Sequence, residues 1–168
     1  MLFMYSQTVL NSIGDVVVIS LILMVSNFIF TIPSIWAINT LGRKTLMVWG
    51  GWTMTISMFC LGLGMMINNM PLCIVAIIIF VLAFEWSWGP VVWMYNAEIL
   101  NDKAFSLAVT FYWLMNMTVT VVAPTIQQAL DPSKAGLLFF GFGIFQFFAT
   151  ILATYKMKET RGLTPLEI

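Results

Sequence analysis

The chain has 168 residues, of which 61% are hydrophobic and 8% are charged, and its formal net charge is zero. Soluble globular proteins average about 45–50% apolar and about 25% charged residues, so this composition excludes an ordinary soluble domain. The zero net charge provides no basic surface for nucleic acid, and the lack of histidine removes the commonest general base and metal ligand. We therefore expect an integral membrane protein without a metal site, a cofactor or a nucleic-acid partner.

Five apolar stretches are long enough to cross a bilayer, which takes about 20 residues per helix. Backbone groups must be paired inside lipid, and stretches of this length are not barrel strands, so each is predicted to be a helix. The fold class is therefore an all-α membrane protein, preceded by a helical stub within residues 1–14 that ends an earlier helix. The predicted spans cover about residues 16–38, 46–67, 72–95, 104–127 and 135–155, followed by a tail at 156–168.

Lysine and arginine residues gather on one side of the predicted bundle. The other side holds only Lys134. The six residues on the positive side are Arg43, Lys44, Lys103, Lys156, Lys158 and Arg161. Because positive residues favour the cytoplasmic side, the tail is predicted to face the cytoplasm or its equivalent. The protein is then a multi-pass protein of the plasma membrane or of an organelle such as the mitochondrion.

Four predicted spans carry a strongly polar side chain near mid-depth, namely Asn27, Glu85, Asn116 and Gln146. A carboxylate at that depth costs about 2.5–3.5 kcal/mol, so a set at a common depth favours a shared polar cavity. The alternative is that these groups only join helices, at roughly 0.6 kcal/mol per hydrogen bond. For Gln146 both interpretations stay open.

The third predicted span contains a Gly89-Pro90 pair. Pro90 has no N–H, so the carbonyl of Trp86 loses its helical partner. Glu85, Gly89 and Trp93 are spaced four apart, which places an acceptor, a gap and a flat ring on one ridge of a continuous helix. Broken helices line cavities in transporters, and an acceptor beside a ring suits a sugar. The alternative for the tryptophan rings is packing or an interfacial belt.

Four patterns together resemble the sugar-porter branch of the major facilitator superfamily, which includes the facilitative glucose transporters. The stretch from Glu85 to Glu98, with Gly-Pro and Trp93 between, resembles the tenth span of that family, and LGRK at 41–44 resembles the loop between the eighth and ninth. SLAVTFYWLMN at 106–116 is similar to the start of the eleventh span, and KETRGLTPLEI at 158–168 to the C-terminal signature. The resemblance implies that the five spans are the eighth to twelfth of twelve, and that the stub ends the seventh.

The resemblance also implies roles for individual residues. In that family a sugar binds between two six-helix halves and alternating access carries it across. The matching positions here are, for sugar contact, Asn27, Glu85, Trp93 and Asn116; for hinge or gating, Tyr5, Gly89 and Pro90; and for a cytoplasmic charge network, Arg43, Lys44, Glu98, Glu159 and Arg161. Three positions depart from the family pattern: Asn39 and Thr40 replace an acidic residue and an arginine, and Tyr112 replaces a frequent asparagine.

Two functions are consistent with these features. The first is transport of a hexose-type sugar, by uniport or proton symport, with this chain as the C-terminal part of a porter that a complementary half completes. The second is a structural membrane subunit of a larger complex that no longer transports. The expected partners are the lipid bilayer, a transporter half or other membrane subunits, and sugar when the chain is complemented. An enzyme is disfavoured, because the sequence offers no nucleophile–base or metal constellation.

Overall fold

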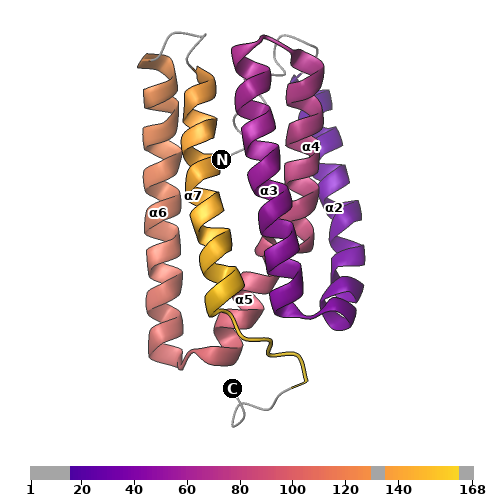
Figure 1. Cartoon of the computed structure of the whole chain (residues 1–168), viewed down its shortest axis with the longest axis vertical. Coiled ribbons are helices and arrows are strands. Elements are labelled where there is room, and N and C mark those ends of the chain that lie inside the picture. The colour runs from indigo at the N-terminus through magenta and orange to yellow at the C-terminus, as the bar shows by residue number, and fades with distance from the viewer. Residues whose placement is uncertain (1–15, 130–134, 163–168) are drawn as a thin grey trace.

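The computed structural model describes residues 16–129 and 135–162, and the regular elements in these ranges are helices. Long helices that follow one another along the chain run in opposite directions, and the short α5 lies at the lower end of the bundle (Figure 1). In chain order the helices are α2 (Val16–Leu41), α3 (Arg43–Met66), α4 (Met70–Trp86), α5 (Trp88–Ile99), α6 (Asp102–Ala129) and α7 (Ala135–Lys156). The predicted all-α membrane fold is confirmed.

Four helical stretches within the described ranges are long and apolar enough to cross a membrane. They are Arg43–Met66, Met70–Ile99, Asp102–Ile126 and Gly136–Lys156. Helix α2, with 26 residues, covers the first predicted span. The predicted stub, including Tyr5, and Lys134 lie outside the described residues.

The third predicted span is divided at Ser87, which separates α4 from α5. Ser87 has φ −131° and ψ −87°, its N–H donates to the carbonyl of Phe84 at 3.2 Å, and its carbonyl accepts from the N–H of Val91 at 3.0 Å. Pro90 therefore lies in the first turn of α5, where a helix needs no N–H donor. The interruption is confined to Ser87, two residues before Gly89.

This break corrects one expectation about the same span. A single ridge that carries Glu85, Gly89 and Trp93 requires a continuous helix, but the helix is interrupted after Glu85. Glu85 is the next-to-last residue of α4, whereas Trp93 belongs to the middle of α5. The carboxylate and the ring therefore sit on two helical segments that different neighbours hold in place.

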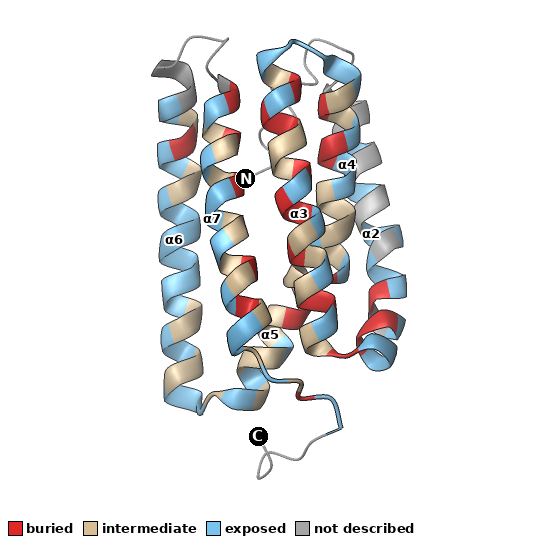
Figure 2. Cartoon of the chain, in the orientation of Figure 1, coloured by how far each residue is buried: buried red, intermediate tan, exposed pale blue. Residues whose placement is uncertain are grey.

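Helix α3 is the centre of packing, with α7 against one side of it and α4 against the other (Figures 1 and 2). Buried side chains form an upper cluster among α3, α4, α6 and α7, and a lower cluster where the end of α2 meets the starts of α3 and α5 (Figure 2). The upper cluster comprises Leu61, Cys73, Ala76, Ile77, Ala123 and Phe139; the lower one comprises Ala37, Ile38, Leu46, Met47 and Val91. The lower cluster fixes the start of α3 and the break beside it.

Helix α6 is the most exposed part of the bundle. It contacts α5 and α7 only sparsely, and its most apolar window contains no buried residue. Large side chains such as Phe111, Trp113 and Met117 are exposed along it. Most of the α6 ribbon is coloured as exposed in Figure 2. A surface of this kind requires lipid or further helices around it, because apolar side chains are stable only away from water.

Candidate functional site

Glu85, at the end of α4, is held by a residue of α2. The Oγ1 of Thr31 donates a hydrogen bond to Oε2 of Glu85 at 3.1 Å. Thr31 comes four residues after Asn27 in the same helix, so the two positions share one face of α2. The side chain of Asn27 lies outside the described part of the structure. Sequence reasoning missed Thr31, although its spacing from Asn27 was a usable signal.

Trp93, on α5, is in contact with Tyr112 of α6. The two ring centroids are 4.9 Å apart, and the planes meet at 76° in an edge-to-face arrangement. Pairs of this geometry contribute about 0.5–1.5 kcal/mol beyond their buried area. Tyr112 was noted in the sequence only as a departure from the family pattern. In the structure it is an aromatic neighbour of the indole ring.

Asn116 follows Tyr112 by one turn on α6 and is exposed. Its Oδ1 accepts a hydrogen bond of 3.4 Å from the hydroxyl of Thr120, and the side-chain amide also brings N–H donors to this face of α6. Gln146 behaves differently: its Nε2 donates to Oγ1 of Thr150 on the same helix at 3.5 Å, and Thr150 is fully buried. This contact lies within α7, so it does not join Gln146 to another helix.

Two of the predicted sugar contacts therefore touch a neighbouring helix. Glu85 of α4 is hydrogen-bonded to α2, and Trp93 of α5 packs against α6. The apolar cavity of about 610 Å³ in the described structure lies elsewhere, between α3 and α4. Its lining includes Thr45, Trp49, Ile79 and Trp86, and none of the predicted sugar contacts. An almost wholly apolar lining does not suit a sugar, so the polar and aromatic contacts remain the candidate site.

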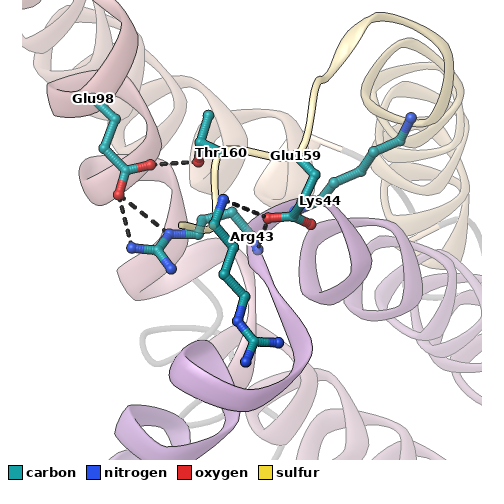
Figure 3. Close-up of polar contacts among 6 residues, drawn as sticks. Arg43, Lys44, Glu98, Glu159 and Thr160 are labelled. Atoms are coloured by element: carbon teal, nitrogen blue, oxygen red, sulfur yellow. Dashed lines mark hydrogen bonds and ion pairs between the residues drawn. The ribbon is translucent and has the colours of Figure 1, made fainter. Parts of the chain in front are cut away.

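Arg43 and Glu98 form an ion pair between the start of α3 and the end of α5. The Nε and Nη2 of Arg43 donate to Oε1 of Glu98 at 3.2 and 2.8 Å, and the hydroxyl of Thr160 donates to Oε2 (Figure 3). Both charged side chains are mostly buried, at 15% and 27% exposure. Within the described residues this is the one ion pair. It joins α3, α5 and the tail at a single carboxylate.

Glu159, in the tail, caps helix α3. Its Oε1 accepts the backbone N–H of Arg43 at 2.8 Å, and its Oε2 accepts that of Lys44 at 3.1 Å. The first N–H groups of a helix have no partner within it, and a carboxylate there is also favoured by the helix dipole. Gly42 makes the approach possible, since its φ is +86° and an added Cβ would lie 2.6 Å from Oε2 of Glu159.

The other two predicted members of the charge network, Arg161 and Lys44, make hydrogen bonds that involve backbone groups. Arg161 donates its guanidinium N–H to the carbonyl of Thr40, at the end of α2, and its backbone N–H to Oε1 of Glu159 at 3.2 Å. Lys44 contributes its backbone N–H, and the backbone N–H of Lys158 donates to the hydroxyl of Tyr95 on α5 at 3.2 Å. Thr40, which departs from the family loop, therefore still takes part, through its carbonyl.

The chain is similar to members of one known protein family. The sequence profile of the family described as "Sugar (and other) transporter" matches residues 1–168. The high glucose sensor RGT2 of Saccharomyces cerevisiae is 28% identical over 99% of this chain and 24% of its own length. D-xylose-proton symporter-like 1 of Arabidopsis thaliana is 31% identical over 98% of this chain and 34% of its own. The D-xylose-proton symporter of Escherichia coli (strain K12) is 28% identical over 98% and 36%.

Solved structures of one such symporter share the fold. The proton:xylose symporter XylE bound to 6-bromo-6-deoxy-D-glucose matches with a TM-score of 0.87 and 28% identity, over 99% of this chain and 38% of that chain. The inward-open conformation of XylE from E. coli matches with a TM-score of 0.76 and 30% identity, over 99% and 39%.

The chain thus spans about a quarter to a third of the length of these relatives. Family and fold agree with the resemblance that the sequence motifs indicated. Because the family profile matches the whole chain, this protein is a multi-pass integral membrane protein of the sugar transporter family in the major facilitator superfamily, a family of transporters and not of enzymes.

Proposed function

We propose that this chain forms the C-terminal part of a sugar porter and contributes one side of the pathway of a hexose-type sugar. The observation that carries the proposal is the broken span. Before the break is a carboxylate, Glu85, that Thr31 holds; after it is an indole ring, Trp93, that Tyr112 supports. The two groups bring the chemistry that a sugar needs from a binding site.

A sugar presents hydroxyl groups and flat patches of C–H. The carboxylate of Glu85 accepts hydrogen bonds from hydroxyl groups, and the exposed amide of Asn116 both donates and accepts them. The flat indole of Trp93 offers a face for the C–H patch. Asn27 belongs to the same proposed set by its position on the face of α2 that carries Thr31.

The charge network is proposed to close the cytoplasmic side of the pathway. It ties the tail to α2, α3 and α5 at the end of the bundle where the described lysine and arginine residues gather. Alternating access then requires these contacts to open when the sugar is released. The match to the inward-open XylE structure has a TM-score of 0.76, against 0.87 for the sugar-bound one, which supports an arrangement other than inward-open.

The substitution Glu85→Gln tests this role in a sugar-uptake assay, because it keeps the shape of the side chain and removes its charge. The chain is co-produced with the N-terminal six-helix half of a sugar porter, and uptake of labelled D-glucose and D-xylose into proteoliposomes is measured. Loss of a hydrogen bond to a charged group is worth about 1.5–3 kcal/mol, so uptake is expected to fall about 10- to 100-fold at unchanged protein yield.

Asp102→Asn is the matched control, since it removes an exposed carboxylate at the start of α6. Equal losses of yield and uptake in Glu85→Gln contradict a role in the sugar site. Sugar binding without uptake in the complemented protein indicates a sensor, which is what the name of the yeast relative states for that protein. Purification in mild detergent with unrelated membrane proteins and no uptake indicates a structural subunit.

A further inference from the structure

The break between α4 and α5 is seated on two adjacent glycines of α3. A Cβ on Gly50 would lie 1.9 Å from Oγ of Ser87, the residue at the break. A Cβ on Gly51 would lie 3.1 Å from Nε1 of Trp88 and 2.6 Å from Oγ1 of Thr150. Real Cβ atoms essentially never lie within 3.0 Å of such atoms, so a side chain at Gly50 would displace Ser87 and one at Gly51 would displace Thr150, whereas its contact with Trp88 would be tight. The Gly50–Gly51 pair therefore forms a notch in α3.

Trp88, the first residue of α5, is bonded to α3 inside this notch. Its indole Nε1–H donates to the carbonyl of Met47 at 2.9 Å. A polar N–H within a membrane span needs such a partner, because lipid supplies none. The ring also packs against the cluster that contains Val91, whose side chain is fully buried. Trp88 therefore combines a directed hydrogen bond with apolar packing.

Helix α5 is short, and α3 holds it at both ends. It has 12 residues, with Trp88 first and Glu98 next to last. Trp88 is bonded to Met47, and Glu98 to Arg43, one turn earlier in α3. A rigid segment that is fixed at two points carries its middle residue, Trp93, to a defined place.

We propose that Trp88 is a positioning residue, which pins the start of α5 in the Gly50–Gly51 notch and thereby sets the place of the Trp93 ring against Tyr112. The claim about α5 depends only on the geometry of this chain. The consequence for sugar binding rests on the function proposed above.

Hydrogen–deuterium exchange of the purified chain in mild detergent tests the pinning without any transport. Trp88→Phe keeps an aromatic ring and removes the N–H. Loss of one hydrogen bond is expected to raise amide exchange in a peptide covering residues 89–99 about three- to tenfold. Trp49→Phe is the control. Trp49 lies on α3, two residues after Met47, and its side chain is 71% exposed, so the same substitution there should leave α5 in place.

Three results of the exchange experiment overturn the pinning. The first is unchanged amide exchange in Trp88→Phe, and the second is a rise in Trp49→Phe equal to that in Trp88→Phe. The third is a rise in exchange in Trp88→Ala but not in Trp88→Phe, because ring packing alone then holds α5. Gly50→Ala is expected to raise exchange on both sides of the break, whereas Gly141→Ala, whose Cβ would have nothing within 4 Å, leaves it unchanged. Equal exchange in Gly50→Ala and Gly141→Ala is a fourth result that overturns the proposal.

Uptake by the complemented transporter tests the consequence for sugar. Trp88→Phe is expected to raise the KM for sugar about three- to tenfold with a smaller change in maximal rate, as for a lost binding contact. Faster exchange with an unchanged KM overturns the link to Trp93. Absence of uptake by the unmutated complemented protein refutes the proposed transport, while the exchange experiment still decides the pinning.

Discussion

Gly42→Ala is expected to release the tail from helix α3. The alanine has to adopt a φ of +86°, a conformation that costs about 1–3 kcal/mol for a residue with a side chain. Its Cβ would also lie 2.6 Å from Oε2 of Glu159, so the carboxylate has to withdraw from the N–H groups of Arg43 and Lys44. Loss of a helix cap costs about 0.5–2 kcal/mol.

Together these effects predict a loss of about 1.5–5 kcal/mol of stability. For a chain of this size, that corresponds to a midpoint of thermal unfolding lower by about 3–20 °C. The assay is the fraction of detergent-solubilised chain that remains monodisperse after heating. The loss should be accompanied by faster cleavage of the tail by an added protease.

Gly162→Ala is the matched control for this variant. Gly162 also has a positive φ, +76°, but a Cβ there would have nothing within 4 Å. The alanine in Gly162→Ala therefore has to adopt an unfavourable positive φ, but its Cβ does not collide with a carboxylate. The cap account is refuted if Gly42→Ala unfolds at the same temperature as Gly162→Ala and its tail resists the protease equally.

Three further substitutions test the other contacts. Glu98→Gln removes the charge of the one described ion pair and is expected to cost about 1.5–3 kcal/mol in the same unfolding assay, whereas an unchanged midpoint contradicts a contribution from the pair. Tyr112→Leu removes the edge-to-face partner of Trp93 and should weaken sugar binding about two- to tenfold in uptake KM; an unchanged KM argues against support of the indole. Thr31→Val keeps the shape of the side chain but removes the donor to Glu85, so uptake should fall about two- to tenfold, and full uptake would separate this contact from the site.

The fold class was accessible from the sequence because lipid leaves few alternatives. Long apolar stretches must become helices, and four of those described are long and apolar enough to span a membrane. Helix starts were less predictable. The second span was expected from about residue 46, but α3 begins at Arg43, because Glu159, far along the chain, caps it. A cap supplied by a distant residue leaves no local pattern.

The break illustrates the same limit. Gly-Pro marked the right region, but the interruption falls at Ser87, where the glycine notch of α3 receives it. Packing between distant segments thus decided the position within a region that local chemistry had selected. Tyr112 and Thr31 escaped prediction for a related reason, since their roles depend on the neighbours that the fold brings to them.

Sugar uptake by reconstituted protein tests the central claim most directly. Liposomes receive this chain alone, a complementary N-terminal half alone, or both together, and the initial rate of labelled D-glucose uptake is compared. The account predicts saturable uptake only with both parts present, and its loss when Glu85→Gln is introduced into this chain. The same uptake with the N-terminal half alone, or none with both parts assembled in one complex, would contradict it.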